Sequence, residues 1–199
     1  MVAGVCPSYL PSIQYMAWIV SQQVISFVTY NTYQKQTYRN RTEIYSPNGK
    51  LRLSIPIIHK KYNSRQLDKE VSIQYGNNWQ KDHWKSLEAS YRSSPFFEFY
   101  EDDFYPFYHQ KFEKLMDFNI NLIQNILLLI GAEVSILHKK KPTKEFADLI
   151  IAKRKKRKEY PVYTLYDPQG RLTIRGQYCS STICNIKVTI NRIIGNNRL

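Results

Sequence analysis

The chain has 199 residues, 43% of them hydrophobic, and a formal net charge of +13. Its 7 Gly and 9 Pro are too few for a low-complexity or disordered chain, and its apolar content is enough for one domain with a core. The 3 cysteines show no metal-binding spacing, and no apolar run approaches the ~20 residues of a membrane span.

The amino-terminal part of the chain predicts strands around a single helix. The charged region of a secretory signal is missing, because the first basic residue is Lys35, and we therefore expect a cytoplasmic protein with reduced thiols. Ser12 can cap a helix whose apolar side chains recur at helical spacing. The turn at residues 46–49 contains Pro and Gly and predicts a hairpin. The expected strands are residues 3–10, 24–30, 33–41 and 51–57.

The predicted strand over residues 33–41 is unusual because it is polar on both faces. Alternation places Lys35, Thr37, Arg39 and Arg41 on one face and Gln36, Tyr38 and Asn40 on the other. A strand inside a domain normally buries at least one apolar face, and an exception of this kind often marks a site. Neighbours on one face are ~6.6 Å apart, so Arg39 and Arg41 could bind one anion with Lys35 within reach. The alternative is an edge strand whose charges prevent aggregation.

The rest of the main body predicts three helices and two short strands. Ser94 and Pro95 are suited to begin the second of these helices, which we expect to end near Pro106 because proline interrupts helical hydrogen bonds. Gly131 stands just past the end of the third helix, where glycine is favoured. The expected elements are a strand over 71–75, helices over 79–91, 94–106 and 112–130, and a strand over 134–137.

The composition changes after the last of these strands. Residues 139–158 hold ten Lys/Arg and two acidic residues, a net charge of +8. The main body holds fourteen basic and twelve acidic residues, so its charge is weak evidence for nucleic acid as a partner. We predict one α/β domain over residues 1–138, with a mixed β-sheet, a β-hairpin and packed helices. A basic linker over 139–160 and a small irregular or β-like tail over 161–199 would follow.

His83 is the candidate catalytic acid or base, because it lies near the start of a predicted helix, next to Asp82, and histidine titrates near neutral pH. The alternative is a histidine that packs or hydrogen-bonds inside the protein. The carboxylates within residues 98–103 diverge on a helix, so a solvated face is expected there rather than a metal site. The sequence has no glycine-rich phosphate loop, and we expect no cofactor.

Several motifs follow one another within residues 8–131. They are Tyr9-Leu10-Pro11-Ser12-Ile13, Tyr33-Gln34-Lys35-Gln36-Thr37-Tyr38-Arg39-Asn40-Arg41, Pro47-Asn48-Gly49, Leu53-Ser54-Ile55-Pro56-Ile57, His83-Trp84 and Ser94-Pro95-Phe96-Phe97-Glu98. In these motifs the chain resembles the WbqC-like protein family, whose namesake is linked to O-antigen and other surface-polysaccharide pathways in bacteria. The resemblance implies a role in making or modifying an activated sugar. Residues 164–199 depart from the family pattern, and either divergence or a change of reading frame near residues 163–167 would account for this.

Together these observations predict a transferase that acts on a nucleotide-activated sugar. The basic face of the polar strand would hold the pyrophosphate, and Gln36, Tyr38 and Asn40 would contact polar groups of the small-molecule ligand. His83 would act as the base. Two rival predictions remain: a non-catalytic binding module that uses the polar strand, and a binder of anionic polymers through residues 139–158.

Overall fold

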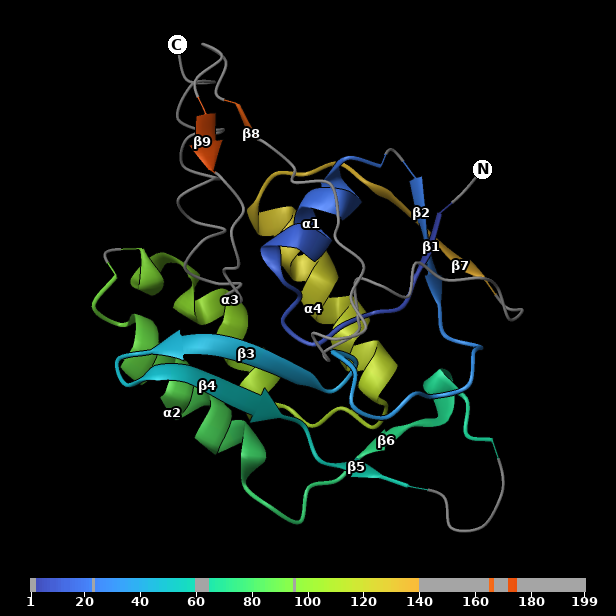
Figure 1. Cartoon of the computed structure of the whole chain (residues 1–199). Helices are drawn as coiled ribbons and strands as arrows, with labels where there is room; N and C mark the ends of the chain where they lie inside the picture. Colours follow the sequence, from blue (N-terminus) through green and yellow to red (C-terminus); the bar gives the residue numbers. More distant parts are fainter. Residues whose placement is uncertain are drawn as a thin grey trace.

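The computed structural model describes residues 3–22, 24–59, 65–94, 96–139, 165–166 and 172–174. These residues form four α-helices, one three-stranded parallel sheet and three two-stranded antiparallel sheets (Figure 1). The predicted α/β class, with a hairpin and packed helices, is confirmed. Within the described part of the chain, parallel and antiparallel strand pairs lie in separate sheets and do not share a mixed one.

The parallel sheet has the order β1–β2–β7, with β1 at Ala3–Val5, β2 at Val24–Val28 and β7 at Ser135–Lys139. Parallel neighbours need a crossover connection, and helix α1 (Ile13–Val20) provides it between β1 and β2. Helix α4 (Leu115–Leu129) precedes β7 in the chain. Figure 1 shows α1 and α4 on the same side of this sheet, where their apolar faces contribute to the core.

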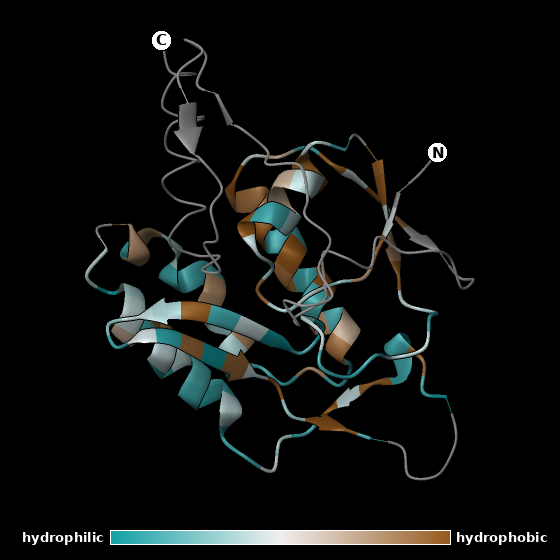
Figure 2. Ribbon diagram, in the orientation of Figure 1, coloured by the Kyte–Doolittle hydropathy of each residue, from teal (hydrophilic) through white to brown (hydrophobic). Residues whose placement is uncertain are grey.

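The predicted hairpin is confirmed as strands β3 (Arg41–Ser46) and β4 (Gly49–Ser54). Gly49 has a φ of +102°, which favours glycine at this turn. Hydrophobic and hydrophilic residues alternate along both strands, as Figure 2 shows. A second antiparallel pair joins β5 (Ile57–Ile58) to β6 (Ser72–Ile73).

Helix α2 (Trp79–Tyr91) has the bounds that the sequence predicts. The predicted cap of α1 is also confirmed, because the Ser12 side chain accepts a hydrogen bond from the backbone N–H of Tyr15 at 3.3 Å. After α4, Gly131 adopts a φ of +65°, as expected for a helix end.

Helix α3 (Phe97–His109) departs from the prediction at both ends. It begins at Phe97, three residues after the predicted cap Ser94. The Ser94 backbone carbonyl accepts a hydrogen bond from the Phe97 N–H, and no side chain caps the helix. It also continues through Pro106, so the predicted stop there is wrong. Phe107 and Tyr108 are buried just after the proline, and their packing offsets the one helical hydrogen bond that proline cannot make.

The predicted polar strand over residues 33–41 is wrong, because only Arg41 lies in a strand. The preceding residues turn repeatedly, and Gln36 has a φ of +60°. Their backbone groups bond to different parts of the molecule: the Tyr33 N–H donates to Gln66, and the Tyr38 carbonyl accepts from Tyr9. Such a path cannot keep the alternating faces of a strand.

Two predicted regions lie mostly outside the described residues. The predicted basic linker over 139–160 is described only at Lys139, so its boundaries stay a prediction. Within the predicted tail, β8 (Leu165–Tyr166) pairs antiparallel with β9 (Leu172–Ile174), where the sequence predicts β-like runs.

Candidate functional site

The turn-rich segment from residue 29 to residue 40 supports the short helix η1 (Asp68–Glu70). The backbone N–H groups of Asp68 and Lys69 donate to the carbonyls of Asn31 and Thr29, at 2.9 and 2.8 Å. An isolated bridge pairs the same segment with the residue before η1. The two stretches are about 40 residues apart in sequence, yet they are held together by main-chain hydrogen bonds.

Arg39 and Asp68 form the side-chain part of this support. The guanidinium donates Nε to Oδ1 at 2.9 Å and Nη2 to Oδ2 at 3.2 Å, and both side chains are 0% exposed. Thr37 lies at 3.4 Å from Nη1, and the thiol of Cys6 donates to Oδ2 at 3.7 Å. This bidentate geometry is the strong form of an Arg–carboxylate contact. In this structure the Arg39 guanidinium therefore faces a carboxylate of the protein itself and is not presented to an anion in solvent.

The other residues of the predicted polar strand are dispersed. Lys35 and Gln36 are exposed, whereas Tyr38 and Arg41 are half-buried. Asn40 is 9% exposed and is held from both sides, donating to the Ile55 carbonyl at 3.0 Å and accepting from the Tyr33 hydroxyl at 3.1 Å. The structure thus does not place Lys35, Arg39 and Arg41 on one strand face. Ligand contact by the exposed and half-buried residues stays a prediction.

His83 lies in a separate buried cluster of aromatic side chains. Its Nδ1 is 2.8 Å from the Tyr9 hydroxyl, which is 3.1 Å from the Tyr108 hydroxyl. The imidazole stacks on the Tyr9 ring with centroids 5.7 Å apart and meets the edge of Trp79 at 5.1 Å. Sequence reasoning missed this chain of polar groups because its members are 74 and 99 residues apart.

The protonation states in this cluster follow from burial. Burial lowers the pKa of His83 from 6.5 to about 4, although Asp82 and a hydrogen bond to the Ser54 backbone oppose the effect. Burial also raises the pKa of Tyr9 well above its usual value. At neutral pH the imidazole is therefore neutral, and its Nδ1 accepts from the protonated Tyr9 hydroxyl. A His83 that is 6% exposed and bonded in this way is arranged to hold the core together; its catalytic role stays a prediction.

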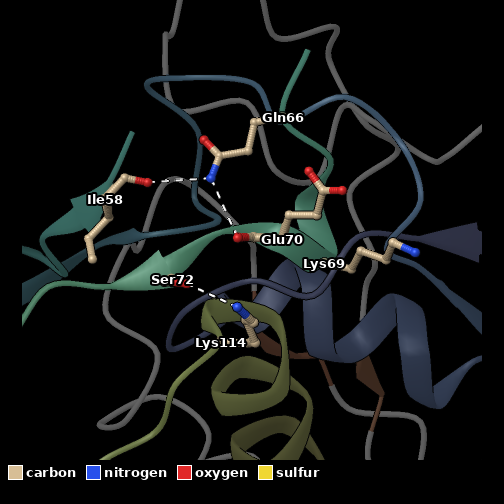
Figure 3. Close-up of a pocket in the computed structure, with 6 residues that line it drawn as sticks. All are labelled: Ile58, Gln66, Lys69, Glu70, Ser72 and Lys114. Carbon is tan, nitrogen blue, oxygen red and sulfur yellow. Dashed lines mark hydrogen bonds between the residues drawn. The ribbon is translucent and has the colours of Figure 1, made fainter. Parts of the chain in front are cut away.

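An open pocket of about 560 Å³ lies beside η1, whose residues Lys69 and Glu70 line part of it. Its six lining residues come from three regions of the sequence: Ile58, Gln66, Lys69, Glu70, Ser72 and Lys114. Figure 3 shows them around the hollow, with Ile58 and Lys69 at opposite ends. The pocket combines two cations, one carboxylate, a hydroxyl, an amide and an apolar side chain, so it can bind an anionic group and hydrogen-bond a polar body at once.

The pocket residues are fixed by the fold around them. Lys114 donates to the Ser72 hydroxyl at 3.1 Å and pairs with Glu113 at 2.7 Å. Lys69 lies 3.9 Å from the centroid of the Tyr30 ring, a cation–π distance. Gln66 reaches the carbonyls of Ile58 and Glu70, at 3.4 and 3.5 Å (Figure 3). These neighbouring groups hold both lysine side chains in place, so the binding of a ligand need not first restrict their rotation.

Sequence reasoning missed this pocket. Gln66, Lys69 and Glu70 belong to no motif in the sequence, and nothing in the local pattern joins them to the start of α4. The connection is tertiary: the Leu115 N–H donates to Val71 at 2.9 Å, and the Ile73 N–H donates to Glu113 at 3.0 Å. These bonds bring Ser72 and Lys114 side by side.

The described residues offer neither a metal site nor a membrane-spanning helix. They contain no group of three or more His, Cys, Asp or Glu side chains placed to hold a metal ion. None of the helices in the described part of the chain is both long and apolar enough to cross a membrane.

Comparison with known proteins places the chain in a family. No curated protein and no solved structure matches it. The model of the WbqC-like protein family matches residues 6–161, which include the Arg39–Asp68 pair, the His83 cluster and all six pocket residues. The match covers more than half of the chain and extends past the motifs in residues 8–131. The chain therefore belongs to the WbqC-like protein family.

Proposed function

We propose that the protein binds a nucleotide-activated sugar in the pocket lined by Lys69 and Lys114, and that it acts as a transferase in the synthesis of a bacterial surface polysaccharide. The observation that carries the binding proposal is the presence of two lysines, one amide, one hydroxyl and one carboxylate around one pocket of about 560 Å³. Membership of the WbqC-like family supports the pathway.

The chemistry of the pocket suits a phosphate attached to a polar body. Lysine ammonium groups bind phosphate as point charges, and Lys114 is already oriented by the Ser72 hydroxyl. Glu70 and Gln66 can hydrogen-bond sugar hydroxyls. Ile58 is 52% exposed at one end of the pocket and offers an apolar wall for a ring (Figure 3). The volume lies within the range of roughly 300–1,000 Å³ that is usual for small-molecule sites.

Arg39 supports this site indirectly. Its ion pair with Asp68 holds η1, and the next two residues of η1, Lys69 and Glu70, line the pocket. The sequence pattern around Arg39 would then reflect the need to support the pocket wall. Alternatively, the anionic group of the ligand contacts the exposed Lys35. Variants of Lys35 and Lys69 distinguish this position from the pocket.

Catalysis by His83 is the less supported part of the proposal. For His83 to take a proton from a substrate, the Tyr9 hydroxyl would have to leave Nδ1 and the buried ring would have to become accessible. A transferase that relies on positioning and charge in the pocket needs no such movement.

The binding proposal is tested by thermal unfolding of the protein with nucleotide sugars, free nucleotides and a polyanion, at low and high salt. We expect one nucleotide sugar to raise the midpoint at both salt concentrations. Lys69→Ala and Lys114→Ala should each weaken its binding by about tenfold, the effect of about 1.4 kcal/mol. Lys85→Ala, at an exposed lysine on α2, is the matched control and should leave binding unchanged.

Two outcomes would contradict this placement, and a third would contradict the transferase activity. Loss of binding in Lys35→Ala, with Lys69→Ala unaffected, would move the site to the turn-rich segment. Stabilisation by the polyanion alone, disappearing at high salt, would favour a binder of anionic polymers through residues 139–158, because counterion release makes such binding steeply salt-dependent. Specific binding without turnover of any tested acceptor would favour the non-catalytic binding module.

A further inference from the structure

His59 lies at the edge of the pocket, directly after strand β5. Its side chain is exposed, and the preceding residue, Ile58, lines the pocket. In the β5–β6 pair Ile58 lies opposite Ser72, which lines the pocket as well. The chain therefore leaves the pocket wall at His59. Histidine is the most frequent proton donor and acceptor of enzymes near neutral pH, so its presence at this edge bears on the chemistry of the pocket.

Two contacts hold His59 near Gln66, another residue of the pocket. The Gln66 amide donates to the Ile58 carbonyl at 3.4 Å (Figure 3), and His59 is the next residue. Because the peptide bond is trans, that carbonyl oxygen lies about 2.8 Å from the His59 Cα, which is thus within about 6 Å of the amide nitrogen. The His59 ring also contacts the Tyr33 ring, with centroids 6.4 Å apart.

Tyr33 is itself fixed beside Gln66. Its N–H donates to the Gln66 carbonyl at 2.8 Å, and its hydroxyl donates to the Asn40 side chain at 3.1 Å. Burial raises the pKa of Tyr33 to about 12, so its hydroxyl stays protonated at neutral pH. Tyr33 can therefore position the imidazole without competing with it for a proton.

His83 is less suited to act on a ligand in the pocket. It is 6% exposed, its Nδ1 accepts from the Tyr9 hydroxyl, and the imidazole also hydrogen-bonds with the Ser54 backbone. A substrate would have to displace the Tyr9 hydroxyl to reach Nδ1. His59 needs no such displacement, because it is exposed beside the pocket.

Glu70 is the other side chain at the pocket that could accept a proton. Its carboxylate accepts from the Leu67 N–H at 3.3 Å and so helps to cap η1. Imidazole is a stronger base than a carboxylate, so a histidine is better suited to remove a proton near neutral pH. The position and the chemistry together favour His59.

We propose that His59 is the catalytic base of the transferase. The inference rests on the proposed function, because it requires a nucleotide sugar whose diphosphate lies on Lys69 and Lys114. A ring nitrogen of His59 takes the proton of an acceptor hydroxyl while the hydroxyl oxygen forms a bond to the anomeric carbon of the sugar. The bond from that carbon to the phosphate oxygen breaks, and its electron pair leaves with the nucleoside diphosphate. The imidazolium then gives its proton to solvent, which reaches the exposed ring.

NMR signals of the histidine rings test the position of His59. The protein has four histidines, so their carbon-bound ring protons can be assigned from single His→Gln variants. Inorganic pyrophosphate is the probe, and calorimetry measures its binding to the same protein. We expect pyrophosphate to shift the His59 signals and to leave those of exposed His109, on α3, unchanged. Lys69→Ala with Lys114→Ala should abolish the shift.

The two ways in which this experiment can fail are distinguishable. Pyrophosphate that binds without moving the His59 signals would overturn the role of His59 and leave the binding proposal standing. No binding of pyrophosphate would contradict the pocket as an anion site, and with it both proposals.

Nucleotide release from UDP-, GDP- and dTDP-sugars, with water or simple sugars as acceptors, tests the catalytic role. His59→Ala should lower kcat at least about hundredfold, while the Kd of the nucleotide sugar changes by less than about threefold. His109→Ala is the control and should keep the wild-type rate. Added imidazole should restore part of the rate in His59→Ala, a response that a merely structural role would not produce.

Three kinetic results would overturn the proposal. The first is a wild-type rate in His59→Ala, and the second is a loss of rate in Glu70→Gln alone, which would assign the base to the carboxylate. The third is binding of a nucleotide sugar to wild type with no nucleotide release, which would also contradict the transferase activity but not the binding site.

Discussion

Arg39 and Asp68, which are 29 residues apart in the sequence, form a bidentate ion pair in which both side chains are 0% exposed. Burial of two charges is costly, and it is tolerated here because each charge has the other and because Thr37 and Cys6 add further contacts. The pair joins the turn-rich segment to η1, and so it links the sequence motif around Arg39 to the wall of the pocket.

Removal of Arg39 should therefore unfold the protein more readily. Arg39→Ala leaves Asp68 buried and unpaired, and we expect it to lower the free energy of unfolding by about 3–5 kcal/mol. Urea denaturation measures this. Arg52→Ala is the control, because the Arg52 side chain is 63% exposed and Glu43 keeps its pair with Lys50, so the loss should be about 1 kcal/mol or less. An Arg39 that contacts a ligand from the surface of a strand would contribute little to stability, so a small effect of Arg39→Ala would argue against the buried pair.

Replacing both members of the pair separates stability from binding. Arg39→Met with Asp68→Leu removes both charges, and we expect it to recover most of the stability that Arg39→Ala loses. If Arg39 acts only by supporting η1, this double variant should keep binding at the pocket within about threefold, as measured by titration calorimetry. Folded protein that no longer binds the nucleotide sugar would instead indicate a specific need for the charges.

Stability should fall in mild acid because of His83. Its pKa is about 4 in the folded protein and 6.5 in the unfolded chain, so the unfolded chain takes up the proton first as the pH falls. The stabilising contribution is complete above about pH 6.5, decreases between about pH 6.5 and pH 4, and levels off below that range. The difference between the two values corresponds to about 3 kcal/mol in total.

Urea unfolding of wild type and variants across this pH range checks the assignment. His83→Gln should remove most of the acid-dependent loss, although the variant is less stable at neutral pH. His59→Gln, at an exposed histidine, should leave the slope unchanged. If the free energy of unfolding depends on pH in the same way in His83→Gln as in wild type, other groups cause this dependence.

The Tyr9 hydroxyl should contribute more to the free energy of unfolding than the hydroxyl of buried Tyr15. Tyr9→Phe leaves both His83 Nδ1 and the Tyr108 hydroxyl without this partner, and we expect a loss of about 1–3 kcal/mol in the free energy of unfolding. Tyr15→Phe is the comparison, because that buried hydroxyl donates to a backbone carbonyl, that of Cys6, at 2.9 Å. Equal losses in thermal or chemical unfolding would argue against a connected network.

Much of the secondary structure could be predicted from local pattern. The hairpin turn needs a glycine at positive φ, and Gly49 marks it in the sequence. Ser12 marks the start of α1, and the aromatic stripe from Trp79 to Tyr91 has the bounds of α2. These signals work because caps, turns and helical stripes depend on residues only a few positions apart.

The candidate sites could not be predicted in the same way. The sequence marks Arg39 as unusual but gives no sign of its partner Asp68, and it predicts two strand faces for the polar residues around Arg39. The error at Pro106 has the same origin, because burial of Phe107 and Tyr108 outweighed a local helix-breaking signal. In each case a contact with a distant residue decided the outcome.

The local patterns of the amino-acid sequence are enough to predict the α/β class, most element positions and, through the motifs, the family to which the chain belongs. Which polar residues face solvent and which face each other depends on the three-dimensional packing. It paired Arg39 with Asp68, joined His83 to Tyr9 and Tyr108, and brought Lys69 and Lys114 to one pocket. The physical reason is that a charged group or hydroxyl can lie in water or, if it has a partner, in the core at similar free energy. Whether a partner from elsewhere in the chain is present decides between these two environments.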